Sequence, residues 1–322
     1  MTGKSEIEDV QTAAKAARIH RFGGPEVIIL EDLVPPAPGE GEVLVRVKAA
    51  GVGPWDAWIR AGKSALPQPL PLTLGSDISG VVEAVGPGVT GFTEGDEVFG
   101  VTNPHFTGGY ADYAVAIAAM LANKPAMLPH IDAASAPVVA VTAWQALFEE
   151  ARVTSGQSVL VLGAAGNVGA FAVQFARRAG LQVYATARTR DLGYVRSLGA
   201  DAFDGGTSWF DASLPPIDAV IDLIGGEPQA RSFTVLRQGG ALISTVAPPD
   251  QSIAAERGVR AAFFLVDVTT ERLARIAAMM EAGALTTSVG AILPLAAARV
   301  AHEMMEGRQP RPRGKIVLRV AE

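Results

Sequence analysis

The 322-residue sequence contains no cysteine. This absence excludes disulfide bonds, thiolate catalysis and every zinc site built on cysteine ligands. It also permits a reducing compartment, and we predict a cytoplasmic location. Basic residues are few as well: 27 Lys and Arg stand against 33 Asp and Glu, a net charge of −6, and no basic run occurs. This balance argues against nucleic acid and against an anionic membrane surface as partners.

Long apolar runs are also missing, because no stretch of about 18 apolar residues occurs, and no membrane-spanning helix is expected. Residues 1–14 carry charges of both signs and no apolar core segment. We expect them to form a flexible N-terminal extension rather than a signal peptide. The composition, 49% hydrophobic and 19% charged, is that of a folded protein. At roughly 150 residues per domain, the length predicts about two domains.

The first part of the chain, residues 15–130, is rich in glycine and proline. Short strands with this punctuation are typical of a mostly antiparallel sheet or barrel. After it, Asp132 is a suitable N-cap for a helix from about Ala133, which would bridge to the next part of the chain. The expected strands lie at residues 43–47, 78–85, 96–101 and 110–115.

From Ser155 onward, apolar strands and helices alternate. This alternation predicts an α/β domain with a doubly wound parallel sheet. One of its helices is expected to end near residues 239–240. The tail, residues 286–322, is too short to fold alone and ends in a β-run, so we expect it to complete the first domain. The expected strands of this part lie at 158–162, 183–187, 217–224, 241–246, 261–266 and, in the tail, 315–320.

A glycine-rich turn joins the strand at 158–162 to the next helix. Aligned to the dinucleotide motif G-x-G-x-x-G, Ala164 takes the first position, and Gly166 and Gly169 take the others. Gly166 would let the backbone approach a pyrophosphate, Gly169 would let the helix pack on the sheet, and the helix N-terminus would hold the phosphates. The alternative is an ordinary turn without a ligand, but the β–α units that follow favour the dinucleotide. The predicted contacts are Gly163, Ala164, Ala165, Gly166, Asn167, Val168 and Gly169.

The end of the second strand of this domain should decide which nicotinamide cofactor binds. An acidic residue there would bind the ribose 2′-hydroxyl of NAD. The sequence instead has Ala187, Arg188 and Arg190. An arginine can pair bidentately with a 2′-phosphate, so these residues favour NADPH. The alternative is that both arginines are solvated surface charges, one of them neutralised by Asp191.

Seven stretches taken together resemble the zinc-free quinone oxidoreductases, the zeta-crystallin-like branch of the medium-chain dehydrogenases/reductases. Zinc-dependent relatives carry a cysteine and a Gly-His-Glu where this chain has Gly53 and Gly75-Ser76-Asp77. A lone Asp77 could not build a three-ligand zinc site, so no zinc is expected. The stretches that carry the resemblance are residues 17–26, 49–56, 74–82, 95–100, 109–113, 163–169 and 313–317.

The resemblance implies two domains and a cleft between them. A GroES-like catalytic domain would contain residues 15–130 and 285–322, and a Rossmann NADP-binding domain would contain residues 131–284. The implied reaction is hydride transfer from NADPH to a quinone or an α,β-unsaturated carbonyl. The resemblance also implies a homodimer joined through an edge strand of the nucleotide domain, for which residues 261–266 are the candidate.

Family members often show Asn-x-x-Asp-x-Tyr facing the nicotinamide, whereas this chain has Gly53, Asp56 and Trp58 at the corresponding positions. We expect Asp56 and Trp58 to line the active site, with Trp58 offering a flat face to a ring but no phenolic proton. The alternative is that Trp55 and Trp58 only fill the core or the cleft wall. His105 lies in a loop that could approach the cleft, but water is the expected proton source.

The resemblance also implies cofactor contacts outside the glycine-rich turn. Some follow the third and fourth strands of the nucleotide domain, where ligands bind in such sheets, and others return from the tail. For Thr142 and Phe264 the alternative is core packing. The implied contacts are Thr142, Tyr194, Leu223, Ile224, Gly225, Val246, Phe264, Arg313, Gly314 and Lys315.

Two other functions stay open at this point. An enoyl reductase acting on acyl-thioester substrates would need a basic patch near the cleft, and the sequence shows no such cluster. A non-catalytic, NADPH-binding structural protein is also compatible, because fold alone does not decide function.

Overall fold

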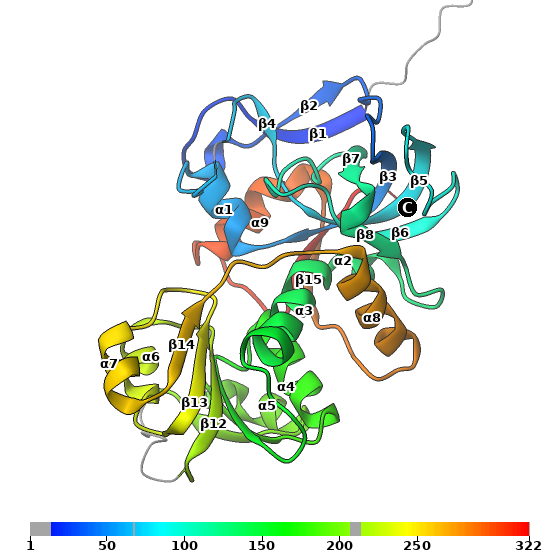
Figure 1. The fold of residues 1–322 in the computed structure, drawn as a ribbon. Helices are drawn as coiled ribbons and strands as arrows, with labels where there is room; N and C mark the ends of the chain where they lie inside the picture. The colour runs from blue at the N-terminus through cyan, green and yellow to red at the C-terminus, as the bar shows by residue number, and fades with distance from the viewer. Residues whose placement is uncertain (1–13, 67, 207–213, 322) are drawn as a thin grey trace, which may run out of the picture.

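The computed structural model describes residues 14–66, 68–206 and 214–321. The expected N-terminal extension, apart from Ala14, lies outside the described residues. Figure 1 shows two lobes, the first formed by the N-terminal half together with the C-terminal tail and the second by the middle of the chain. Among the described helices, none has the length and apolar character needed to cross a membrane.

The first lobe contains a seven-stranded sheet in which only β15 and β16 pair in parallel. The tail supplies both of these strands, and β16 pairs with β3 from the N-terminal part, so the tail does complete this sheet. Across the sheet the order is β15 (Val289–Pro294), β16 (Lys315–Arg319), β3 (Glu42–Val52), β5 (Asp77–Val85), β6 (Glu97–Val101) and β8 (Leu121–Asn123), and β7 (Tyr113–Ile117) also pairs with β3.

A three-stranded sheet and short helices complete this lobe. Both sheets bury their apolar residues in one core, which includes Ile19, Val45 and Leu318. The small sheet has the order β2 (Ile29–Leu33), β1 (Ala14–Ile19), β4 (Leu72–Thr73). The helices are η1 (Pro25–Val27), α1 (Pro54–Arg60), η2 (Ala118–Met120), η6 (Leu295–Ala297) and α9 (Ala298–Met305).

The second lobe contains a six-stranded sheet in which every pair is parallel. In chain order its strands read 3-2-1-4-5-6, which is the order of a dinucleotide-binding doubly wound sheet. The expected edge strand, β14, lies at one edge. Across the sheet the strands are β11 (Asp201–Asp204), β10 (Gln182–Ala187), β9 (Ser158–Leu162), β12 (Ile217–Asp222), β13 (Leu236–Ser244) and β14 (Arg260–Phe263).

Helices cover both faces of this sheet because successive side chains of a strand point to opposite faces. Val159 and Val161 pack on the face covered by α4 and α5, and α3 packs on α4. Leu160 and Leu162 pack toward α6 and α7, whereas α8 lies against α3 and against β8 of the first lobe. The bounds of the helices are α3 (Pro137–Trp144), α4 (Asn167–Arg178), α5 (Leu192–Ser197), α6 (Gly226–Ser232), α7 (Gln251–Arg257) and α8 (Thr270–Glu281). The short η4 (Thr189–Asp191) follows β10, and the junction adds α2 (His130–Ala134) and the π-helix η3 (Gln145–Glu150).

The prediction that Asp132 caps one bridging helix from about Ala133 is wrong. Pro129 is the N-cap of α2, and a second helix, α3, begins at Pro137. A proline cannot donate a helical hydrogen bond and restricts the residue before it, so it starts a new helix rather than continuing α2. Asp132 instead accepts a hydrogen bond from the Thr287 hydroxyl of the tail, at 2.5 Å.

The expectation that a helix ends near residues 239–240 is also wrong. The helix α6 ends at Ser232, and Gly239 and Gly240 lie within β13. The pairing register of β12 and β13 shifts beside them, and Gly239 has a φ of +75 that suits a bulge. Glycine was read as a helix end, but here it marks an irregular strand. The boundaries proposed at residues 130 and 285 remain predictions.

Candidate functional site

A cavity of about 900 Å³ opens between the two lobes. Its walls are the turn after β9, the end of β10 and the segment that leads into β16. A smaller hollow beside it is lined by Tyr194 and Lys315, among others. The predicted cofactor contacts that line the large cavity are Gly163, Ala165, Gly166, Asn167, Ala187, Arg188, Arg190, Ile224, Arg313 and Gly314.

The remaining predicted residues line neither hollow. Some of them belong to the turn after β9 or to the start of α4 without lining a cavity. Others lie at the ends of neighbouring strands or in the first lobe. They are Asp56, Trp58, Thr142, Ala164, Val168, Gly169, Leu223, Gly225, Val246 and Phe264.

The turn from β9 to α4 is built for a close approach of the backbone. Gly163 has a φ of +84, which favours glycine. A Cβ on Gly169 would lie 2.5 Å from the Gly163 carbonyl oxygen and 2.6 Å from the Ala164 Cα, so only glycine lets α4 start this close to β9. No described side chain caps α4. Its first amides and the positive end of its dipole are therefore available to an anion at the cavity wall.

The arginines after β10 differ in their partners. The Arg188 side chain is exposed and makes no hydrogen bond or ion pair with a described residue. The Arg190 side chain is 73% exposed, and its Nε lies 3.6 Å from Asp191 Oδ2. The Asp191 carboxylate also pairs with Arg313 of the tail, at 3.3 Å. The end of β10 therefore offers one unpaired guanidinium and one weakly paired guanidinium to the cavity.

The carboxyl ends of β12 and β13 meet beside this cavity, held together by a buried carboxylate. Asp222 accepts hydrogen bonds from the amides of Ile224 and Gly225, at 3.1 and 2.9 Å. Its other oxygen accepts from the Ser244 hydroxyl at 2.8 Å. Ile224 and Val246 are left 48% and 44% exposed although both are apolar. Sequence reasoning missed Asp222, although a polar residue ending an apolar strand is a usable signal.

The predicted contacts Thr142 and Phe264 are tied into the protein interior. Thr142 is buried, and its hydroxyl donates to the Val138 carbonyl of its own helix at 2.7 Å. Phe264 is partly buried against the core of the second lobe, and its amide donates to the Ser244 carbonyl at 3.2 Å. These contacts agree with the core-packing alternative for both residues.

A tryptophan of α1 lies against the buried Lys315 of the tail, and this residue is Trp55 rather than Trp58. The Trp55 indole N–H donates to the Ser76 hydroxyl at 3.1 Å, and the Lys315 ammonium lies 4.4 Å from its ring centroid. Trp58 is 54% exposed, on the side of α1 that faces away from the buried residues of this helix. Residues 56, 59 and 60 form the buried face of α1 and residue 58 does not belong to it, but the sequence pattern alone does not say which face of this short helix is buried.

Asp56 is buried beneath this region and holds the start of α1. Its Oδ2 accepts from the Gly53 amide at 2.8 Å and from the Tyr110 hydroxyl at 2.9 Å. Its Oδ1 has no partner among the described residues. Burial raises the pKa of Asp56 to about 7, against the lowering effects of the Gly53 amide and the Lys315 charge. The carboxyl is thus a helix cap in an apolar setting rather than a wall of the cavity.

Comparison with known proteins agrees with this architecture. The alcohol dehydrogenase GroES-like domain matches residues 39–126, and the zinc-binding dehydrogenase family matches residues 198–318. The human quinone oxidoreductase is 32% identical and covers 91% of this chain and 94% of its own length. The chain is a member of the quinone oxidoreductase family. The prediction of a GroES-like domain with a Rossmann domain is confirmed, and the chain is a medium-chain oxidoreductase.

Two other relatives extend the comparison. The tomato 2-methylene-furan-3-one reductase is 32% identical and covers 96% of this chain and 80% of its own length. The structure of a mycobacterial protein complexed with NADPH is 30% identical, with a TM-score of 0.84, and covers 95% of this chain and all of its own.

The residues of this quinone oxidoreductase homologue do not fit the zinc ion of the dehydrogenase family. Asp77 is buried, with Oδ2 at 2.7 Å from the Lys315 ammonium and Oδ1 accepting from the Val138 amide at 3.0 Å. An ammonium therefore lies where a cation would bind Asp77. No group of three or more His, Asp or Glu side chains within the described ranges is arranged to hold a metal ion.

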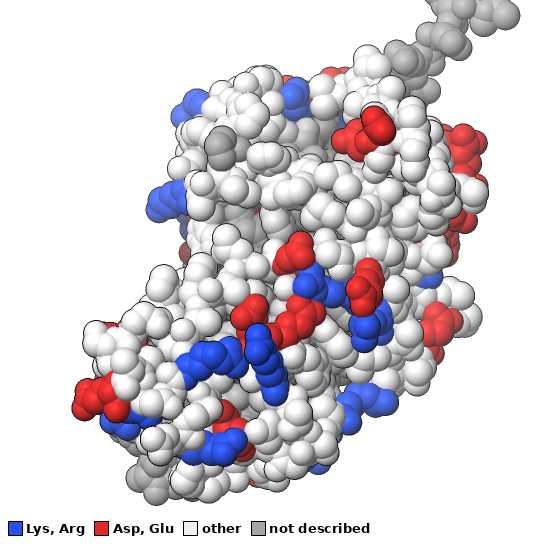
Figure 2. Space-filling view, viewed as in Figure 1, with Lys and Arg blue, Asp and Glu red and all other residues white. Residues whose placement is uncertain are grey.

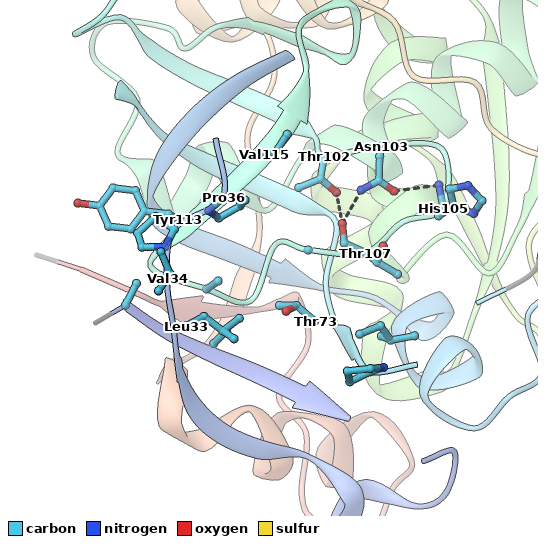
Figure 3. A pocket seen from close by; sticks show the side chains of 18 of the residues that line it. Leu33, Val34, Pro36, Thr73, Thr102, Asn103, His105, Thr107, Tyr113 and Val115 are labelled. Atoms are coloured by element: carbon cyan, nitrogen blue, oxygen red, sulfur yellow. Dashed lines mark hydrogen bonds between the residues drawn. The ribbon is translucent and has the colours of Figure 1, made fainter. Parts of the chain in front are cut away.

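A second cavity, of about 520 Å³, lies in the first lobe of the homologue between β1, β7 and the loop at 102–108 (Figure 3). Thr102 and Asn103 both donate to the Thr107 carbonyl there, at 2.7 Å each. His105 lines this cavity and not the one at the glycine-rich turn. The structure therefore does not bring His105 together with the predicted cofactor contacts.

Proposed function

We propose that this protein is a zinc-independent reductase that transfers a hydride from NADPH to a quinone or an α,β-unsaturated carbonyl. The observation that carries the proposal is the cavity in which an uncapped helix N-terminus and the arginines after β10 face the same space. The human relative is a quinone oxidoreductase, the tomato relative reduces an enone, and the mycobacterial relative was crystallised with NADPH.

The residues present fit NADPH. The first amides of α4 would hold the pyrophosphate, and Arg188 and Arg190 would hold the 2′-phosphate. Ile224 and Val246, apolar and half exposed at the ends of β12 and β13, would cover the nicotinamide side and exclude water from it. Bound there, the cofactor supplies the hydride, and the protein's task is to orient the two reactants in a dry cleft.

Trp55 is our candidate for the acceptor side of the cleft. It packs edge-to-face on Phe106, with ring centroids 6.4 Å apart, and its indole N–H is held by Ser76. Such a fixed aromatic face would contribute about 1 kcal/mol to stacking a flat acceptor. We assign protonation of the product to water, because the Asp56 carboxyl is buried as a helix cap and His105 lines the other cavity, in the first lobe.

The alternative functions have less support. Figure 2 shows both charge signs interspersed on one face of the molecule, with no broad basic area that would suit the phosphopantetheine arm of an acyl carrier.

We also propose the domain division at residues 130 and 285, a cytoplasmic location, and a homodimer formed through β14. The exposed side chains of Phe263 and Leu265 at that edge support the homodimer.

The test measures oxidation of NADPH with a benzoquinone, a naphthoquinone, an enal and an enoyl thioester, and compares the wild type with Arg188→Ala/Arg190→Ala. Turnover is expected with the quinones or the enal. The double variant should bind NADPH more weakly by about 1.5–3 kcal/mol and NADH almost unchanged, because the 2′-phosphate loses its charge-assisted hydrogen bonds.

Arg275→Ala is the matched control, since Arg275 is an exposed arginine outside the cavity that pairs with Glu271. It should leave both cofactors unaffected. NADPH binding without turnover on any acceptor would favour the non-catalytic alternative. Equal losses for NADPH and NADH in the double variant would contradict the role of these arginines.

A further inference from the structure

Asp191 is the only acidic side chain on the described wall of the cavity, where it faces several arginines. The wall also carries Arg188, Arg190, Arg311 and Arg313. The Asp191 side chain is only 15% exposed, and its two oxygens meet different arginines: Oδ1 lies 3.3 Å from Arg313 Nε and Oδ2 lies 3.6 Å from Arg190 Nε. A single carboxylate thus partly neutralises an otherwise cationic wall.

The pair with Arg313 crosses from one lobe to the other. Asp191 belongs to η4 of the second lobe, whereas Arg313 lies two residues before β16 of the first sheet. The Arg313 guanidinium also lies over the ring of Tyr194, 4.1 Å from its centroid. Arg313 is therefore held by two groups of the second lobe, and its position does not depend on Asp191 alone.

Asp191 has no local structural task that would explain its carboxylate. It is the N-cap residue of α5, yet its side chain makes no capping hydrogen bond. Its partners are the two arginines on the cavity wall, and one of them, Arg190, is mostly exposed and free to turn. An anion that binds at this wall would compete with the Asp191 carboxylate for Arg190. The negative charge of the carboxylate would also repel the anion.

We propose that Asp191 is a built-in counter-ion for the 2′-phosphate subsite, which lowers the affinity for NADPH relative to NADH. This inference rests on the proposed function and adds a residue that sets cofactor selectivity. In the structure the carboxylate pairs with Arg190 and Arg313. When a 2′-phosphate binds, Arg190 turns to it, while Arg313 stays over Tyr194 and keeps its pair with Asp191 across the cleft.

The test compares wild type and Asp191→Asn by calorimetric titration with NADPH, NADH and the fragment 2′,5′-ADP. Asparagine keeps the size and an accepting oxygen for Arg313 but removes the negative charge. The variant should bind NADPH and 2′,5′-ADP about 3- to 10-fold more tightly and NADH within about 2-fold of wild type. The gain should shrink at high salt, because it is electrostatic and partly exposed to solvent.

Asp201→Asn is the matched control, since Asp201 lies on β11 of the same lobe, outside the cavity, and accepts from Gln182 at 2.9 Å. It should change none of the three affinities. Unchanged or weaker NADPH binding in Asp191→Asn, with wild type still preferring NADPH to NADH, would overturn the counter-ion role alone. No preference for NADPH in the wild type would instead overturn the cofactor assignment of the proposed function.

Discussion

Asp56 shows how burial changes the chemistry of a single carboxyl group. Burial raises its pKa from 3.8 to about 7 in the folded protein. Between these values the folded protein keeps a proton that the unfolded chain has released, so the free energy of unfolding falls as the pH rises through this window. The contribution of Asp56 to stability is therefore present in acid and lost toward neutral pH, which is opposite to that of an ordinary paired carboxylate.

Asp56→Asn should remove this loss, because an asparagine can accept from Gly53 and Tyr110 without carrying a charge. The free energy of unfolding of the variant, relative to wild type, should rise by about 1–3 kcal/mol between about pH 5 and about pH 8. Urea unfolding at both pH values measures it. Asp32→Asn, at an exposed carboxylate paired with Lys15, is the control and should show no such trend. A difference independent of pH would refute the burial argument.

At the residue scale, the sequence predicted which types of side chain lie near the candidate site better than it predicted which individual residue points toward it. The arginines after β10 could be predicted, because the end of a strand can be located from residues that are neighbours in the sequence. Residue type alone does not distinguish Trp58 from Trp55, because both are tryptophans and they lie only three residues apart. The side of α1 that is buried depends on α9 and on the tail, which pack against it from more than 200 residues away.

At the scale of elements, the turn from β9 to α4 combines local sequence with tertiary contact. The glycine spacing predicted the turn, and its context predicted the strand and helix on either side. The positions of proline and glycine elsewhere misled the prediction, as at Pro137 and Gly239, because each residue is compatible with two local structures. Packing selects between them, and a motif of several residues limits the choice more than one residue does.

Gly169→Ala should destabilise the second lobe, because the new Cβ would meet backbone atoms of Gly163 and Ala164 at 2.5 and 2.6 Å. The expected loss is about 1–3 kcal/mol in the free energy of unfolding. NADPH binding should fall with it, since the helix start moves away from the turn. Urea unfolding and a cofactor titration measure the two effects.

Gly193→Ala is the control for this substitution. Gly193 lies within α5 with nothing within 4 Å of an added Cβ. Alanine there should stabilise the helix by up to about 1 kcal/mol and leave cofactor binding unchanged. If both alanine variants behaved alike, the close approach of backbone atoms would not explain why residue 169 is a glycine.

At the scale of the whole molecule, one buried ion pair joins three distant segments. The Lys315 ammonium of β16 pairs with Asp77 of β5 at 2.7 Å, and Asp77 accepts from the first turn of α3 at 3.0 Å. Burial raises the pKa of Asp77, and the Lys315 charge opposes that rise. The tail, the first sheet and the helix that leads to the second lobe thus depend on one another.

Lys315→Met should cost about 3–5 kcal/mol of the free energy of unfolding, because it leaves Asp77 buried without its counter-ion. The double variant Lys315→Met/Asp77→Asn removes both charges and should recover much of that loss. Urea unfolding of the two variants and wild type measures the coupling. A double variant as unstable as Lys315→Met would show that the packing of the lysine, rather than its charge, matters here.

The sequence by itself determined the class of each half of the molecule, the glycine-rich turn after β9 and the arginines beside it. These features depend on periodicity and on residues that are neighbours in the chain, so they can be read locally. Only the tertiary structure decided that Asp191 faces Arg313, that Lys315 neutralises Asp77, and that Trp55 rather than Trp58 is turned inward. Each of these contacts joins the tail to a segment that is distant in the sequence. The spacing of residues along the chain does not reveal such contacts, because they are set by how distant segments pack in the folded protein.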